Sequence, residues 1–390
     1  MAITKAVAYC RIDDSFAAGK AAIEAVMQKL DGQSPDFLLL FTTVGHDIEK
    51  VLKGIQAVAP DIPLCGCSGS GTITNLGCDE ATHSVALMGL QSNQVRFHPF
   101  LVSGLSTNAL EVGKQIGETI QSLGLSEAER KLLFLFPDGI TVKADDLFNG
   151  IKSVVTYDID FAGGTAGNDY SYSKTYQFCN QEILSDAVSG VLISGDFEYV
   201  IGVSHGCKPI GNYKTVTKVQ DNVIYEIDGK PALELLKSSL GTDLSSDIWK
   251  ANLLGLGQSF EGKNYSEDII IRGFLGFDEE NGGIKIGAEM PVGALIRFTR
   301  RDKVKVKKGT KIIAEQVIEQ IKTKNAAYFY FNCMSRGSYL FDESNADVDV
   351  VQEVLGADSD LIGFFAFGEI APVSGTNYFH NHTGVLVALQ

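Results

Sequence analysis

The stretch Phe37-Leu-Leu-Leu-Phe41 and the segments that follow it decide the fold. A continuous apolar run of this kind is typical of a strand that is buried on both faces. Apolar residues at helical spacing follow over Asp47–Val58, and a glycine-rich turn, Gly66-Cys-Ser-Gly-Ser-Gly71, comes next. A second strand is expected over Ser84–Leu90, so the predicted order is strand, helix, turn and strand.

The same order of segments occurs twice more along the chain. The second copy begins with the apolar run Leu132–Phe136 and reaches a turn at Ala162–Gly167. The third begins at Tyr328–Phe331 and reaches a turn at Gly363–Gly368. In each copy a small residue and a glycine stand five positions apart, which indicates a repeated β-α-β-β unit. A strand and a helix also precede each copy, at 6–9 and 17–30, at 95–100 and 109–123, and at 294–298 and 310–321.

Alternating helices and buried strands predict an α/β fold, and the closing strand of each unit adds antiparallel pairing, so the sheets are expected to be mixed. At about 150 residues per domain, the 390 residues suffice for two to three domains. We expect two: residues 1–215, with repeat units 1–92 and 93–197, and residues 216–390. Residues 200–290 are less regular, and they are either a degenerate fourth copy or an insert.

The composition excludes some classes of partner. Lysine and arginine total 33 against 48 for aspartate and glutamate, which gives a formal net charge of −15. Phosphate backbones and anionic membranes both attract basic surfaces, so neither nucleic acid nor membrane insertion is expected. The most basic stretch, Arg297–Lys311, alternates with apolar residues as a half-exposed edge strand does. The seven cysteines are scattered and no signal peptide is visible, so we expect free thiols and a cytoplasmic location.

The first glycine-rich turn is the densest polar cluster. Glycine lets a ligand approach the backbone closely, and exposed amides in such turns bind anions. The turn lacks the lysine of a P-loop, the following helix of a dinucleotide fingerprint and the second glycine of a nucleophile elbow. Two interpretations therefore stay open: a ligand-lining turn containing Cys67, Ser68 and Ser70, or a tight sheet turn without a ligand.

Other chemistries are possible for cysteine, serine and histidine side chains. If Cys67 or Ser68 were a nucleophile, the protein would be a thiol- or serine-dependent hydrolase or transferase, but the sequence places no base beside either. His380 and His382 would share a face of a strand and, with Glu369, could hold a metal. Packing or surface exposure explains these groups more simply, so no cofactor or metal is expected. Cys65, Cys67, Cys78 and His83 have the number and type of side chains for a zinc site, but their spacing matches no standard zinc motif.

The third unit carries the charges best placed for a ligand. Arg336 lies just past a buried strand, and Glu369 follows Gly368 at the end of the third turn. Asn381 and Thr383 stand two positions apart and share a face if this segment is extended. A guanidinium pairs with carboxylates and a carboxylate accepts from ammonium groups, so these residues could hold the two ends of an amino acid. Alternatively, Arg336 and Glu369 pair with each other as a structural bridge.

Taken together, these motifs resemble the FIST proteins, the F-box and intracellular signal transduction family. The matching segments are Cys65-Gly-Cys-Ser-Gly-Ser-Gly-Thr-Ile, Pro137-Asp-Gly139, and Gly363-Phe-Phe-Ala-Phe-Gly368-Glu-Ile with Asn381-His-Thr383. The resemblance spans a FIST N-like region at about 30–215 and a FIST C-like region at about 220–372, within the two expected domains. The family more often has Gly-Cys-Ser-Thr-x-Gly-Glu in the first turn, so Gly69 and Thr72 depart from its pattern.

The resemblance implies a sensory protein that binds a small polar ligand such as an amino acid and relays its occupancy to a downstream signalling partner. The two domains would close over the ligand, which shifts the population toward the closed form. The rivals are the hydrolase or transferase described above and a scaffold without a ligand. The residues expected at the ligand are Cys67, Ser68, Ser70, Gly163, Gly164, Thr165, Arg336, Gly368, Glu369, Asn381 and Thr383.

Overall fold

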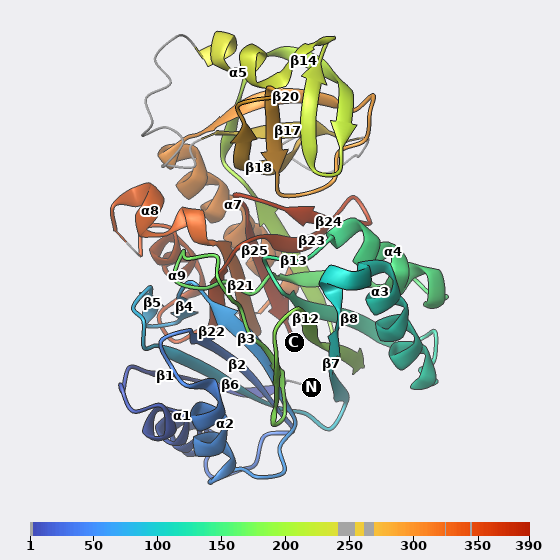
Figure 1. Cartoon of the computed structure of the whole chain (residues 1–390). Coiled ribbons are helices and arrows are strands. Elements are labelled where there is room, and N and C mark those ends of the chain that lie inside the picture. Colours follow the sequence, from blue (N-terminus) through green and yellow to red (C-terminus); the bar gives the residue numbers. More distant parts are fainter. Residues whose placement is uncertain (1–2, 241–253, 261–268, 324, 344) are drawn as a thin grey trace.

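The computed structural model describes residues 3–240, 254–260, 269–323, 325–343 and 345–390. They form three six-stranded mixed sheets and a seven-stranded antiparallel sheet that is closed by pairing of β14 with β15. The closed sheet, called the barrel below, lies at one end of the molecule (Figure 1). The fold is therefore α/β with mixed sheets, as the sequence predicted. None of the described helices is long and apolar enough to cross a membrane.

The three mixed sheets are built from three units with the same order of elements. Unit 1 consists of β1 (Thr4–Cys10), α1 (Ser15–Lys29), β2 (Phe37–Thr43), α2 (Ile48–Gln56), β3 (Leu64–Gly69), β4 (Thr72–Thr74), β5 (Gly77–Asp79) and β6 (Val85–Gln91). Unit 2 consists of β7 (Val95–Ser103), α3 (Leu105–Ser122), β8 (Arg130–Pro137), α4 (Ala144–Val154), β9 (Asp160–Gly164), β10 (Gln177–Cys179), β11 (Glu182–Leu184) and β12 (Ala187–Gly195).

Unit 3 is interrupted after its first strand by the barrel. Unit 3 consists of β13 (Tyr199–Ser204), α7 (Lys303–Ile321), β21 (Ala327–Cys333), the short helices η1 (Met334–Arg336) and α8 (Ser338–Phe341), α9 (Val348–Leu355), β22 (Asp360–Ala366), β23 (Glu369–Val373), β24 (Thr376–His380) and β25 (Gly384–Leu389). The barrel consists of β14 (Cys207–Gln220), β15 (Val223–Ile227), β16 (Lys230–Pro231), α5 (Ala232–Leu240), β17 (Leu254–Ser259), β18 (Ile269–Asp278), β19 (Gly283–Ile286) and β20 (Leu295–Arg301).

The strand pairing corrects one prediction about this region and decides a question that the sequence left open. The predicted first strand of the third copy, 294–298, lies in β20 of the barrel, while β13 takes that place and pairs with β25 as β1 pairs with β6. Residues 207–301 are therefore an insert in unit 3, which decides between the two interpretations of residues 200–290. The domain boundary at 215/216 lies within β14 and stays a prediction, as does descent of the three units from one repeated sequence.

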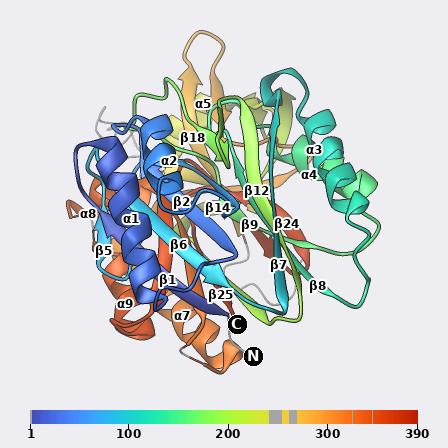
Figure 2. The ribbon, with the colours of Figure 1, turned by 90° about the horizontal axis from the view of Figure 1, so that it is seen from below.

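Each unit extends the sheet of another unit with its short hairpin. β10 of unit 2 pairs with β3 of unit 1, β23 of unit 3 pairs with β9 of unit 2, and β4 of unit 1 pairs with β22 of unit 3. The exchange closes the three sheets into a ring, and Figure 2 shows the helix pairs on its outside. Separate apolar clusters join each helix pair to its own sheet.

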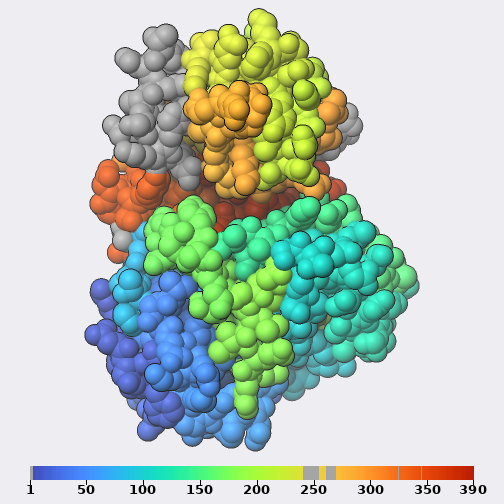
Figure 3. Space-filling view, in the orientation of Figure 1, coloured from blue at the N-terminus to red at the C-terminus, as the bar shows by residue number. Residues whose placement is uncertain are grey.

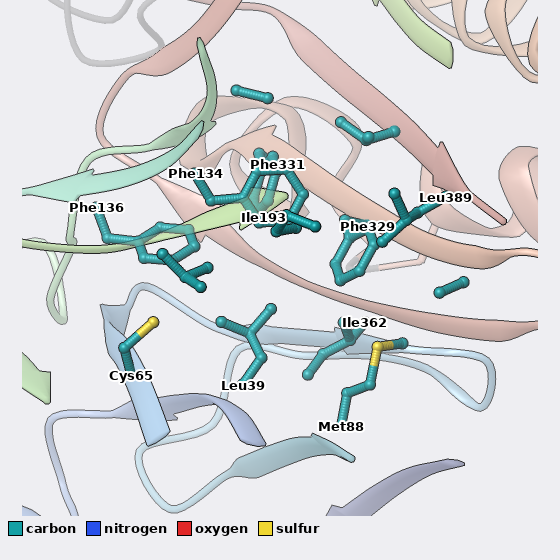
Figure 4. Close-up of a cluster of buried hydrophobic side chains, with 14 of the residues drawn as sticks. Leu39, Cys65, Met88, Phe134, Phe136, Ile193, Phe329, Phe331, Ile362 and Leu389 are labelled. Atoms are coloured by element: carbon teal, nitrogen blue, oxygen red, sulfur yellow. The ribbon is translucent and has the colours of Figure 1, made fainter. Parts of the chain in front are cut away.

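The inner faces of the three sheets share one aromatic core (Figure 4). Phe41 of β2 lies 5.3 Å from Phe136 of β8, between ring centroids, and 4.5 Å from Phe364 of β22. Phe331 of β21 lies 5.5 Å from Phe134 of β8. The pairs of rings from different units are mostly edge-to-face, an arrangement that stabilises aromatic clusters beyond the area they bury. The apolar runs of the three units are thus the central strands of the ring.

Glycine at one register position allows the parallel strands to approach each other. A Cβ atom on Gly66, Gly163 or Gly363 would lie 1.8, 2.2 or 1.9 Å from a carbonyl oxygen of the neighbouring parallel strand. The sequence comparison had aligned Ala162 with Gly66 and Gly363, but the pairing shows that Gly163 is their equivalent. These glycines therefore satisfy a packing requirement of the sheets.

We expect Phe331→Ala to lower the free energy of unfolding by about 3–5 kcal/mol, because it leaves a cavity where all three units meet. Leu76→Ala is the control, since this side chain is 74% exposed, and it should change the free energy by less than about 0.5 kcal/mol. Urea unfolding followed by circular dichroism measures both. Equal, small effects would contradict a shared core.

Candidate functional site

The ends of the central strands form three equivalent corners of the ring. Thr43, Asp138 and Cys333 occupy the same position, because each backbone N–H donates to a carbonyl at the start of the closing strand, over 2.9–3.0 Å. Glu369, Thr72 and Gln177 are also equivalent, because each stands one residue before the strand partner of Gly163, Gly363 or Gly66. We call the corner of unit 3, defined by Cys333, Ser335, Arg336, Glu369 and His382, the third corner.

Two segments without counterparts elsewhere in the ring meet at the third corner. One is the barrel, whose connections to unit 3 begin after Ser204 and end after Arg301. The other is the link between β9 and β10, residues 165–176, which has twelve residues, whereas 70–71 and 367–368 have two each. Figure 3 shows this link, in light green, on the face below the barrel and beside the orange residues around α8. The third corner is therefore the one that the fold has elaborated.

Arg336 is fully buried, and its five N–H groups all have protein acceptors. Nε donates to Oδ2 of Asp347 over 3.0 Å, and Nη2 donates to Oγ1 of Thr310 over 2.7 Å and to Oδ1 of Asp347 over 3.3 Å. Nη1 donates to the carbonyl oxygens of Ser204, over 2.6 Å, and His382, over 3.5 Å. The structural interpretation of Arg336 is supported, but its ion-pair partner is Asp347 and not Glu369. The expected bond to a ligand carboxylate therefore has no donor left to make it.

Asp347 was missed because no local signal marks it. It stands directly before α9 and is fully buried. Besides Arg336 it accepts from the hydroxyl of Tyr330, over 2.8 Å, and from Nδ2 of Asn332, over 3.0 Å. The network fastens the end of β21 to α7 and α9, and it orients the turn that carries the third corner.

Glu369 is fully buried and only half used by the protein. Its Oε2 accepts from the backbone N–H of Thr383 over 3.0 Å, whereas Oε1 has no partner with hydrogen-bond geometry among the described residues. The thiol of Cys333 lies close enough to the carboxyl to oppose the rise of its pKa. Burial raises the pKa of Glu369 well above its ordinary value, and burial also raises the pKa of the nearby Cys333 thiol to about 12. A buried carboxyl in this state favours a proton or a donor group from a ligand.

The two polar residues expected beside Glu369 serve the backbone. Oδ1 of Asn381 accepts from the N–H of Gly273 in β18 over 2.9 Å, so it fastens the barrel to unit 3. Oγ1 of Thr383 donates to the carbonyl of Asn381 over 2.9 Å. Thr383 thus reaches Glu369 through its amide, and its hydroxyl is not presented to a ligand.

Burial disfavours the charged form of both histidines near the chain end. Nε2 of His380 lies 3.1 Å from the carbonyl oxygen of Ala371, and burial lowers the pKa of His380 to about 3. Burial also lowers the pKa of His382 well below its ordinary value. The part of the chain that the structure describes has no group of three His, Cys, Asp or Glu side chains arranged to hold a metal ion.

The three glycine-rich turns meet, but they hydrogen-bond to one another instead of lining a hollow. The amide of Ser70 donates to unit 3, that of Gly167 to the carbonyl of Ser68, and that of Thr165 to the carbonyl of Gly368, over 2.8–2.9 Å. Gly163 and Gly164 pair with β23, and a Cβ on Gly368 would collide with the Phe379 ring. The contacts among the turns are thus made within the protein, and the expectation that the turns also face a ligand stays a prediction.

The polar side chains of the first turn are also committed to the protein. Oγ of Ser68 donates to the carbonyl of Gly167 over 2.8 Å and accepts from the N–H of Tyr176 over 3.0 Å. Oγ of Ser70 lies 3.9 Å from Sδ of Met334. Cys67 is fully buried in the aromatic core, and burial raises the pKa of its thiol well above the ordinary value. This environment opposes formation of a nucleophilic thiolate.

Arg301 is a second arginine at the third corner that the sequence did not indicate. It lies in the basic stretch that we expected to be a half-exposed strand, yet it is only 4% exposed. Its Nη1 donates to the carbonyl of Ser335, and burial lowers the pKa of the guanidinium. The last residue of the barrel is thereby bonded to the turn that follows β21.

Comparison with known proteins agrees with this architecture. Residues 36–230 match the FIST N domain model and residues 232–372 match the FIST C domain model. The chain belongs to the FIST family. Two uncharacterized proteins, of Mycobacterium tuberculosis strain H37Rv and Mycobacterium bovis, are each 27% identical to this FIST protein, over 378 and 387 residues, and each alignment covers 94% of both chains.

More distant matches extend the comparison. An uncharacterized protein of Methanocaldococcus jannaschii is 25% identical over 396 residues, covering 90% of this chain and 74% of that protein. Among solved structures, a chorismatase aligns over 100% of this chain and 99% of its own, with a TM-score of 0.35 and 7% identity. A cyanuric acid hydrolase aligns over 100% of both chains, with a TM-score of 0.34 and 8% identity.

Replacing Arg336 by Met should lower the free energy of unfolding by about 3–5 kcal/mol, because the Asp347 carboxylate would stay buried without its cation. Lys53→Met removes a lysine from an exposed ion pair with Glu49 and should have little effect. Denaturant titration of both variants tests the assignment. A stable Arg336→Met variant would return Arg336 to the list of residues available to a ligand.

The raised pKa of Glu369 predicts a pH dependence of stability. The folded state holds this proton more tightly than the unfolded state, so the stabilisation is complete below the ordinary pKa and is lost as pH rises toward the folded-state pKa. Glu369→Gln removes this loss, and we expect it to gain stability relative to the parent between pH 5 and pH 8. Urea midpoints at both pH values measure the change, with the exposed Glu118→Gln as control. Parallel profiles would rule out a raised pKa.

Proposed function

We propose that this FIST protein is a cytoplasmic sensor that binds a small polar metabolite at the third corner and relays its occupancy to a partner protein. The observation that carries the proposal is the Glu369 carboxyl, fully buried beside the attachments of the barrel, with Oε1 free of any partner in the described residues. A ligand with an ammonium or another donor group satisfies this oxygen. An amino acid is one such ligand.

The energetics favour a ligand that donates. A buried acceptor without a partner destabilises the folded state by about 1–3 kcal/mol, and more when the group is charged. An ammonium group beside Glu369 also stabilises its ionised form, which desolvation disfavours. The guanidinium of Arg336 is fully used, so the ligand carboxylate, if present, needs donors other than this side chain.

The relay would run through the attachments of the barrel. The carbonyl of Ser204, just before the barrel, accepts from Arg336, and Arg301, at its end, donates to Ser335. Asn381 bonds to Gly273 inside the barrel. A ligand that binds more tightly to one position of the barrel shifts the population toward it, by no more than the difference in affinity. The exposed barrel surface would then present this change to the partner.

A thermal-shift screen against amino acids, amines and other small metabolites tests the proposal. A ligand at 100 times its dissociation constant adds about 2.7 kcal/mol to stability, enough for a clear shift. We expect the shift to be lost in Glu369→Gln and retained in Glu118→Gln. If no compound shifts the parent, or if Glu369→Gln responds as the parent does, the ligand site is not at the third corner.

A further inference from the structure

The link between β9 and β10 holds two tyrosines in an unfavourable backbone conformation. Tyr170 and Tyr172 have φ angles of 68° and 52°, in the left-handed region that bulky residues rarely adopt. Each such residue costs roughly 1–2 kcal/mol. Strained residues of this kind persist where the surrounding structure holds them, and they cluster at ligand sites.

The strained link places its tyrosines against aromatic rings of unit 3. The ring centroid of Tyr172 lies 4.7 Å from that of Phe367, and the ring centroid of Tyr170 lies 6.2 Å from that of Tyr339. The hydroxyl of Tyr172 lies 3.8 Å from Sδ of Met334. Tyr172 and Tyr339 are 49% and 41% exposed, so part of this aromatic surface is open to solvent.

A carboxylate of unit 1 lies beside these rings. Glu80 accepts from the backbone N–H of Ser338 over 2.8 Å, from its Oγ over 2.7 Å, and from the hydroxyl of Tyr170 over 3.2 Å. Within the described parts of the chain, no lysine, arginine or histidine forms an ion pair with Glu80. The three units thus contribute to one patch of aromatic rings beside the Glu80 carboxylate, and the cation nearest in effect is Arg301, which acts electrostatically on Tyr339.

We infer that Glu80, Tyr170, Tyr172 and Tyr339 form a binding site for a small organic ammonium ion. Aromatic faces attract cations through the ring quadrupole, and tyrosine surfaces next to a carboxylate suit a group that is both apolar and positively charged. A hard metal ion requires about six oxygen ligands, which one carboxylate and the two hydroxyls bonded to it do not supply. The residues of this site are not those of the third corner, so either site can exist without the other.

Choline is a suitable probe, and its uncharged isostere 3,3-dimethylbutan-1-ol is the matched neutral compound. Calorimetric titration at constant ionic strength should show choline binding to the parent protein, with the neutral compound about tenfold weaker or absent. Tyr172→Ala and Glu80→Gln should each weaken choline by about tenfold. Tyr213→Ala should bind as the parent does, because Tyr213 has a similar exposure, 47%, but lies in the barrel.

Three results would overturn the inference: no choline binding to the parent, equal binding of the neutral compound, or unchanged affinity in both Tyr172→Ala and Glu80→Gln. Circular dichroism of each variant shows whether it is folded. Because Glu80→Gln keeps an acceptor for Ser338 and the side chain of Tyr172 is half exposed, at least one of the two variants is expected to fold. Choline binding that is sensitive to Glu369→Gln but not to Glu80→Gln would assign the ammonium group to the third corner instead.

Discussion

A strand at the edge of a sheet leaves backbone N–H and C=O groups without partners. In each of the three mixed sheets, a hairpin from another unit pairs with the outer parallel strand and supplies these partners. Because the exchange is cyclic, the ring closes only when all three units are present. Closure also brings the glycine-rich turns into contact, where their amides and carbonyls satisfy one another. The aromatic core and the positions of the corners follow from this pairing.

Because the ring has three equivalent corners, comparing them shows which corner differs from the other two. At the position of Glu369 the other corners have Thr72 and Gln177, and at the third corner alone the chain adds the barrel and the long link 165–176. Apolar replacement of a buried ion pair is often neutral or stabilising, so packing alone does not require Arg336 and Asp347. The buried pair lies beside the Glu369 carboxyl, and its bonds to Ser204 and Thr310 connect the third corner to the start of the barrel and to α7.

Much of the ring could be predicted from sequence, because its central strands are continuous apolar runs and its helices have clear periodicity. The exchange of hairpins could not, since the short strands carry no signal that names their partner unit. The glycines were the main source of error: the same residue type serves a close ligand and a close strand, and Gly66 and Gly363 serve the strand. Ala162 was aligned in place of Gly163 because the comparison matched the five-residue spacing along the sequence. The register between strands, which identifies Gly163, cannot be read from that spacing.

The candidate site was predicted in part, and the reason is the range of the interactions involved. Glu369 was found because it follows a recognisable motif at a strand end, whereas the partner of Arg336 lies on another helix and depends on tertiary contacts. Arg301 was expected to lie on a half-exposed strand, because alternation along a strand does not reveal that the end of the barrel packs against unit 3.

The three-residue turn η1 joins the two proposed sites physically. Met334 contacts Tyr172 of the strained link. The carbonyl of the neighbouring Ser335 accepts from Arg301, and Oγ of Ser335 lies 3.0 Å from Sγ of Cys333. Arg336 closes the turn and is held by Asp347 and by the carbonyl of Ser204. A displacement of η1 would therefore change the contacts of Tyr172 and of both barrel attachments together. Since a packed turn moves between discrete arrangements more readily than it deforms continuously, a ligand at either proposed site would bias the contacts on the other side of η1.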